Sequence, residues 1–207
     1  MELAGRLAVV KVSGNPTDLS DESLTRITDT EWQITTASKR IIDRAVDPTL
    51  EKDDAGWDDI QYLSANKLTG VFTFASPGHP AGSSIRVKTT SPTANYLPLS
   101  TAAYAHSYTY SRGVDLIDIT AFLATHKKRI PGQKYASGTI SQWDVTDSYF
   151  EDALTEGEPV VLEFRGQASG DPQRVWALLE SQEMAAAIDA PQGETVSFIS
   201  TDELLNI

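Results

Sequence analysis

The chain has 207 residues, of which 40% are hydrophobic and none is a cysteine. This composition is typical of a globular protein with a sizeable core, and it excludes disulfide bridges, a thiolate metal site and a cysteine nucleophile. The formal net charge of −12 argues against tight wrapping around nucleic acid, because binding to phosphates requires Lys and Arg.

The charge is unevenly distributed along the chain. Residues 1–60 carry 13 acidic and 7 basic residues, residues 61–140 carry 2 and 8, and residues 141–207 carry 14 and 2. A basic middle and an acidic end could let one copy attract the opposite patch of the next copy. The alternative interpretation is that loops simply vary in charge and that the segments interleave in space.

The N-terminal half predicts several β-strands separated by turn-rich stretches. The first predicted strand is LAVVKV (7–12), and DIQYLSANKLTGVFTF (59–74) predicts a hairpin that turns around residues 65–67. The stretch SPGHPAGSS (76–84) has two prolines and two glycines, which break regular structure. We expect one domain over residues 1–207 with an extended N-terminal half, and residues 76–84 are the candidate for a subdomain boundary.

The stretch TAAYAHSYTYSRG (101–113) alternates between large rings and small groups. One face of this predicted strand would carry Tyr104, His106, Tyr108 and Tyr110. A face of rings favours packing in a core or against another subunit, and a platform for stacking sugar rings is the alternative.

The C-terminal half predicts further strands around a basic loop and one helix. The basic loop is LATHKKRIPGQK (123–134). Ser148 and Glu151 have the spacing of a helix capping box, and Phe150 begins an apolar face with the residues three and four positions later. Gly157 is placed to end the helix. Later strands are predicted at PVVLEF (159–164), RVWALLESQEM (174–184) and ETVSFIST (194–201).

No catalytic motif is recognisable in the sequence. His79, His106 and His126 lack the spacing of metal ligands, and no phosphate-binding glycine motif or serine-hydrolase motif occurs. The acidic cluster at positions 53, 54, 58 and 59 lacks the ligand pattern of a calcium loop, so a solvated turn is favoured over a cation site. We therefore expect no catalytic residue, no metal site and no cofactor, although a hydrolase that uses carboxylates is the enzymatic alternative.

Three stretches of the second half carry a resemblance to a known family. They are VDLIDITAF (114–122), IPGQKYASGTISQWDV (130–145) and DSYFEDALTEGEPVVLEF (147–164). Their succession of strand, Ile-Pro-Gly turn, Trp-Asp step, acidic helix and Pro-Val-Val-Leu-Glu-Phe strand resembles the core of tail tube (major tail) proteins of long-tailed bacteriophages. The resemblance spans roughly residues 108–200.

The resemblance implies a mainly β fold, a tail-tube-like β-sandwich or small β-barrel with one flanking α-helix. It implies a structural virion protein without enzymatic activity, whose copies form hexameric rings that stack into the phage tail tube. This tube would be the channel for DNA delivery, with an acidic lumen through which DNA passes without specific binding. Other phage tail proteins would be partners, and assembly would occur in the host bacterial cytoplasm without membrane insertion.

Four residues are candidate subunit contacts. Lys127, Lys128 and Arg129 lie in the predicted basic loop, and Tyr108 lies on the predicted face of rings. The basic loop could alternatively touch nucleic acid, but four bases without interleaved aromatic residues make that interpretation weaker. The alternatives for the whole chain are a tail terminator or distal tail protein, which would stop at one ring, and a β-sandwich module that binds a carbohydrate or receptor.

Overall fold

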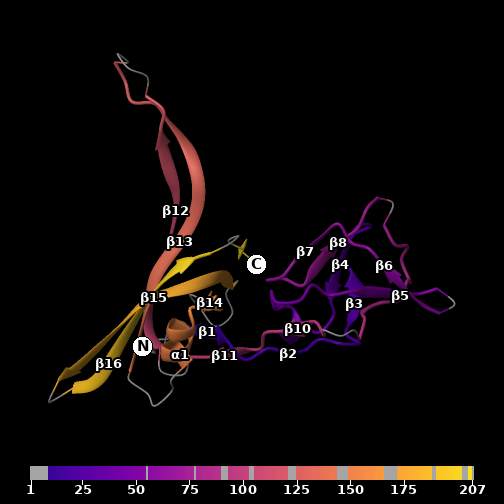
Figure 1. Cartoon of the computed structure of the whole chain (residues 1–207), viewed down its shortest axis with the longest axis horizontal. Coiled ribbons are helices and arrows are strands. Elements are labelled where there is room, and N and C mark those ends of the chain that lie inside the picture. The colour runs from indigo at the N-terminus through magenta and orange to yellow at the C-terminus, as the bar shows by residue number, and fades with distance from the viewer. Residues whose placement is uncertain are drawn as a thin grey trace, which may run out of the picture. The chain divides into compact units, whose positions relative to one another are not determined.

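The chain divides into two compact units. The computed structural model describes residues 9–54, 56–76, 78–89, 93–102, 105–120, 125–143, 149–165, 172–187, 190–201 and 205–206. Unit 1 comprises Met1–Val12 and Thr101–Ile207, and unit 2 comprises Ser13–Ser100, drawn from indigo to magenta in Figure 1. The division differs from the predicted boundary, since residues 76–84 lie inside unit 2. Two compact units can form one domain or two, so the single domain stays a prediction.

Unit 1 is built on one antiparallel eight-stranded sheet. The strand order is β11-β1-β14-β15-β16-β13-β12, and β17 pairs with β15. The strands are β1 (Val9–Ser13), β11 (Leu99–Thr101), β12 (Ala105–Asp118), β13 (Arg129–Trp143), β14 (Val160–Arg165), β15 (Gln173–Ala187), β16 (Ala190–Ser200) and β17 (Leu205–Asn206).

One face of this sheet forms the core of unit 1. Ile140 on β13, Leu162 on β14 and Phe198 on β16 are fully buried on this face, since every second side chain of a strand points to the same face. Helix α1 (Tyr149–Glu156) packs against β15 and contributes Phe150 and Ala153 to this core, as the apolar spacing predicted. The prediction of a mainly β protein with one flanking α-helix is confirmed for the described residues.

Unit 2 holds a second antiparallel sheet and a small strand pair. The seven-stranded order is β6-β5-β9-β3-β4-β8-β7, and β10 pairs with β2. A short 3-10 helix, η1 (Ala37–Lys39), follows β4. The strands are β2 (Thr17–Asp18), β3 (Ser23–Arg26), β4 (Glu31–Ile34), β5 (Leu50–Asp53), β6 (Trp57–Ile60), β7 (Ser64–Asn66), β8 (Val71–Thr73), β9 (Ile85–Val87) and β10 (Asn95–Tyr96).

The predicted hairpin of unit 2 is confirmed, with a shifted turn. Strands β7 and β8 pair, but the turn follows Asn66 rather than centring on it. The Asn66 side-chain oxygen accepts hydrogen bonds from the amides of Leu68 and Thr69, at 3.1 and 3.2 Å. Gly70 ends the turn at a φ of 65°, a conformation that glycine adopts without steric cost.

In unit 1 the predicted basic loop is shorter than expected, since β13 already begins at Arg129, and the predicted Ile-Pro-Gly turn is wrong. Residues 130–132 lie inside β13, and β12 is one continuous strand instead of two. Pro131 lies opposite Leu116, beside a register shift between Val114 and Leu116. A strand accepts proline at such an irregularity because the missing amide hydrogen would not complete a regular ladder.

Candidate functional site

Strands β12 and β13 continue beyond the rest of the unit 1 sheet as a two-stranded hairpin. On its second side, β13 pairs with β16 only from Ser137 to Trp143. Residues 112–118 and 129–136 pair only with each other, and we call these two segments the arm. The remainder of the unit 1 sheet, with α1, is called the body. Figure 1 shows the arm as a long curved ribbon that leaves the body.

The arm exposes large apolar side chains on both faces. Ile117 and Ile130 lie directly opposite each other on one face, and Leu116 points to the other face by strand alternation. Leu116 is 61% exposed, Ile117 51% and Ile130 41%. An isolated two-stranded hairpin is only marginally stable in water, and contiguous exposed apolar side chains mark interaction surfaces. The arm is therefore the strongest candidate for contact with a partner.

The end of the arm is basic. Lys127, Lys128 and Arg129, all predicted subunit contacts, are exposed and adjacent, and we call them the basic tip. In residues 105–120 and 125–143 they form no ion pair. The nearby Asp118 accepts hydrogen bonds from the hydroxyl and the amide of Thr120, which hold the pKa of Asp118 below its usual range. The tip therefore carries more positive than negative charge.

The fourth predicted contact residue, Tyr108, lies against the core of its own unit. Its ring centroid is 5.0 Å from that of Phe164, and the Tyr110 ring lies 5.4 Å from the same residue. Tyr104 is outside the described residues. His106 leaves the predicted face of rings and contacts Trp143 at 4.5 Å, because a register shift between Ala105 and Ser107 interrupts the alternation. The role of Tyr108 as a subunit contact stays a prediction.

Part of the face of the body opposite the core carries small hydroxyl side chains. Strand pairing aligns Thr109, Thr139, Ser197 and Ser181 in one row across β12, β13, β16 and β15, and a second row joins Ser107, Ser141 and Thr195. The side-chain oxygens of Thr109 and Thr139 are 2.9 Å apart, and those of Ser181 and Ser197 are 2.6 Å apart. We call these seven residues the hydroxyl face. Its side chains are uncharged, and the exposed Glu183 on β15 lies opposite Thr195 at the end of the second row.

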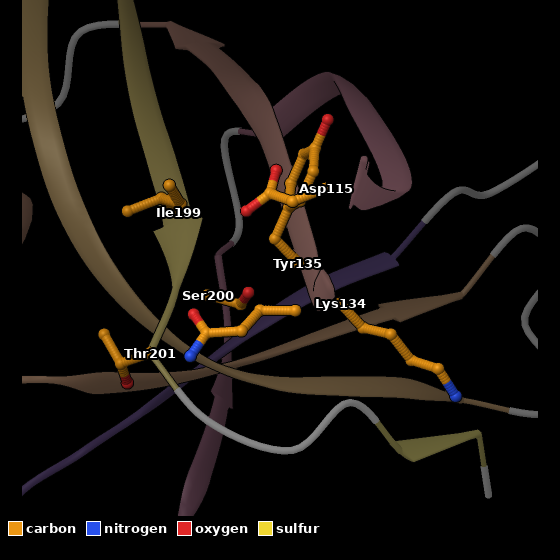
Figure 2. Close-up of a pocket in the computed structure, with 7 residues that line it drawn as sticks. Asp115, Lys134, Tyr135, Ile199, Ser200 and Thr201 are labelled. Carbon is orange, nitrogen blue, oxygen red and sulfur yellow. The ribbon is translucent and has the colours of Figure 1, made fainter. Parts of the chain in front are cut away.

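A pocket of about 590 Å³ lies beside the arm, at the end of β16 (Figure 2). The ring of Tyr135 lies over Gly113, where any side chain would collide with it. Figure 2 shows the Asp115 carboxylate beside this ring, while the Lys134 side chain points away from it. The lining residues are Asp115, Gln133, Lys134, Tyr135, Ile199, Ser200 and Thr201.

A buried ionic cluster holds three strands of the body together. The Glu163 carboxylate on β14 is fully buried and lies 3.4 Å from the Lys11 ammonium. The guanidinium groups of Arg165 and Arg174 donate to it at 2.9 and 2.8 Å. Burial acts to raise the pKa of Glu163, but the hydrogen bond and charge of Arg174, with help from the other two cations, hold that pKa below its usual range. The cluster stabilises the body.

The other titratable groups considered in the sequence form no site. His79 packs edge-on against Phe74 at 4.7 Å, and burial and then the charge of Lys52 lower its pKa. In the acidic cluster of unit 2, Asp54 pairs with Lys52 at 3.1 Å and Asp59 pairs with Lys88 at 2.6 Å. A group of three or more side chains able to hold a metal is absent from the described residues. None of their helices is long and apolar enough to cross a membrane.

Comparison with known proteins gives matches among solved structures. No family model and no curated protein matches the chain. It is similar to the tail of an empty gene transfer agent (GTA) particle with C6 symmetry, at a TM-score of 0.45 and 14% identity, covering 53% of this chain and 87% of that one. A chain of the native GTA virion gives a TM-score of 0.44 at 16% identity, and the match covers 53% of this chain and 88% of that chain. The SPP1 tail tube gives a TM-score of 0.42 at 18% identity, and the match covers 53% of this chain and 67% of that chain. Over about half of its length, the chain is thus similar to chains from a virion, a tail and a tail tube.

Proposed function

We propose that this protein is a structural virion protein and a subunit of a phage tail tube. Its copies assemble into hexameric rings, and the rings stack into the channel through which DNA is delivered. Its partners are further copies of itself and other tail proteins, its location is the virion tail, and its role is structural rather than enzymatic. The sequence resemblance over residues 108–200 suggests this role, and the arm is the observation that carries it.

Burial of the exposed apolar side chains of the arm by another molecule would be favourable. Full burial of one Leu or Ile side chain contributes about 1.5–3 kcal/mol, and the arm presents Leu116, Ile117 and Ile130 to water. Because these side chains are already 39–59% covered, burial of the exposed part of all three would strengthen a contact by about 2–4 kcal/mol, which is roughly a hundredfold in affinity. When a projecting hairpin contacts a different surface of the next copy, the contact is heterologous and generates rings or open polymers.

The hydroxyl face supports the same proposal, because it is a surface along which DNA could pass. In the tube that we propose, this face lines the lumen. Thr109, Thr139 and Ser197 offer hydroxyl groups but no net charge to a passing phosphate backbone. Tight nucleic-acid binding depends on cations, so such a wall would let DNA pass without specific binding. The exposed Glu183, which lies opposite Thr195 in the second row, would add negative charge to this wall.

Negative-stain electron microscopy across a concentration series, with light scattering on the same samples, tests the proposal. We expect stacked rings or tubes with an open channel from the natural chain. A variant with Leu116→Ser, Ile117→Ser and Ile130→Ser should require about a hundredfold higher concentration to assemble. Its unfolding temperature should stay close to that of the natural chain, because all three side chains are exposed.

The other outcomes of this experiment are informative. Rings that never stack would indicate a tail terminator or distal tail protein. Assembly of the arm variant at the natural concentration would overturn the role of the arm. A carbohydrate-binding module is disfavoured, because Tyr108 and Tyr110 pack on Phe164 and do not form a free platform.

A further inference from the structure

The C-terminal end of α1 accumulates negative charge. Glu156 is the last residue of the helix, Glu158 follows two positions later, and both side chains are exposed. The last turn contains no Lys or Arg. Helix C-termini carry partial negative charge on their free carbonyl groups, so carboxylates there are unfavourable and cations are stabilising. Gly157, whose amide donates to the Ala153 carbonyl at 3.1 Å, closes the helix without adding a charge.

The basic tip has the complementary charge and lies far from this helix end in its own chain. From Arg129 to Trp143, a straight β13 would measure about 45 Å. The six-residue step from Trp143 to Tyr149 spans at most about 21 Å, and α1 itself adds about 11 Å. For a straight strand, about 13 Å would remain, which exceeds the screening length of about 8 Å at physiological salt. Figure 1 agrees, with α1 beside the body and the tip at the far end of the arm.

We propose that the basic tip of one copy binds the C-terminal end of α1 on a second copy. Lys127, Lys128 and Arg129 would approach Glu156 and Glu158 and the free carbonyl groups of the last helical turn. This inference rests on the proposed function and names the partner surface of the arm. The apolar neighbours of the tip, Ile119 and Ile130, are 40% and 41% exposed, and they favour a protein partner over a nucleic acid.

The geometry of this contact fits an assembly that grows. Tip and helix end are separate surfaces of one chain, so every copy offers one of each and the contact is heterologous. The charges would speed encounter and select the orientation, and the apolar side chains of the arm would supply most of the affinity. The contact should therefore weaken with added salt without disappearing.

Charge reversal on each surface separately gives a direct test. Variant A carries Lys127→Glu, Lys128→Glu and Arg129→Glu, and variant B carries Glu156→Lys and Glu158→Lys. In A both surfaces are acidic, and in B both are basic, so each alone should need about tenfold higher concentration to associate. An equimolar mixture of A and B should associate at close to the natural concentration, because the tip of each fits the helix end of the other. Sedimentation velocity measures all three samples.

A chain with both sets of reversals gives a second reading. It should again be self-complementary and should associate like the natural chain. Variant B also controls for folding, because cations at a helix C-terminus should leave the unfolding temperature unchanged or raised. Glu180→Lys with Glu183→Lys makes the same charge change at exposed positions of β15 and should leave association unaffected.

The failure of this inference can be told apart from failure of the tube. If the mixture of A and B associates no better than either variant alone, the pairing is overturned, whatever the natural chain forms. Normal association by B alone would overturn it as well. If A and B associate with each other but the natural chain forms no rings or tubes at any concentration, the pairing stands and the tail tube function fails.

Discussion

Strand β13 passes through two environments, and its two isoleucines show the difference. Ile140 lies in the body, where β16 and β12 flank the strand, and it is fully buried. Ile130 lies in the arm, where only β12 pairs with the strand, and it is 41% exposed. The same residue type in the same strand thus stabilises the fold in one half and is available to a partner in the other. Neighbouring strands, rather than residue type, decide which role an apolar side chain takes.

The body and the arm also differ in whether their charged side chains are buried and paired or exposed. In the body, Glu163 is fully buried and is satisfied by three cations of its own chain. In the arm, Lys127, Lys128 and Arg129 are exposed. A buried charge is costly unless groups of the same protein pair with it, whereas an exposed charge is solvated and remains available to another molecule.

The largest effect should come from shortening the two isoleucines of β13. Ile140→Ala opens a cavity in the core and should lower the free energy of unfolding by about 2–5 kcal/mol. Ile130→Ala should change it by less than about 0.5 kcal/mol while weakening assembly. Urea unfolding of both variants, with light scattering, checks this contrast. Equal losses of stability would show that the arm is part of the folded core.

Removal of the buried carboxylate should have the next largest effect. Glu163→Gln leaves three cations around a neutral group and should cost about 1–3 kcal/mol at neutral pH, since the cations are partly exposed and regain water. The low pKa of Glu163 means that its stabilisation is complete above the unfolded value of about 4.3 and disappears as the pH falls through the folded value.

The pH dependence separates this cluster from the arm. Thermal unfolding of the natural chain between pH 7 and pH 3 should show a loss of stability that Glu163→Gln reduces. The triple serine variant of the arm should show the natural pH profile. A profile that Glu163→Gln leaves unchanged would mean that other carboxylates govern acid unfolding.

Two glycines of β13 extend the comparison to backbone packing. A methyl group at Gly138 would collide with the Thr109 carbonyl and lie 2.9 Å from the Phe198 ring, so Gly138→Ala should cost about 1–3 kcal/mol. In the arm, a methyl group at Gly132 would lie 3.2 Å from both the Asp115 carbonyl oxygen and the exposed Ile117 side chain, which is tight but not a collision. Gly132→Ala should therefore cost less, as chemical denaturation of both variants would reveal.

The smallest effect is expected on the hydroxyl face. Thr139→Val removes a hydroxyl that lies 2.9 Å from the Thr109 hydroxyl, and it should cost less than about 1 kcal/mol. Ser181→Ala makes a comparable change at the other end of the row and serves as the control. Urea midpoints measure both variants. A loss of several kcal/mol would indicate that this face stabilises the fold rather than serving as an open surface.

The sequence predicted the body better than the arm. Alternation and helical spacing identify β14, α1 and β16 because their apolar side chains point into one core. The arm was missed because Pro131 and Gly132 are typical of turns, and only the register shift opposite Leu116 allows them within a strand. Subunit contacts at Lys127, Lys128 and Arg129 were proposed from charge alone, and the structure places them at the end of a hairpin.

Only part of the hydroxyl face could be predicted from the sequence. The alternation of large rings and small groups in residues 101–113 places Ser107 and Thr109 on one face of a strand. Their partners Thr139 and Ser197 come from distant parts of the chain, and strand pairing alone brings them together. Single-strand patterns reveal which residues share a face, but not which strands lie side by side.

The insertion of unit 2 between β1 and the rest of unit 1 has a consequence for synthesis. Val9 on β1 pairs with Arg165 on β14, and all of unit 2 lies between them in the chain. On the ribosome, unit 2 and β11 are complete once residue 101 has emerged, so β1 can pair with β11 early, while its other partner, β14, is made later. Domains tend to fold as units during translation, and distant strand pairings form slowly. A newborn chain would therefore fold from its middle outward, with the assembly arm formed before the sheet that carries it is closed.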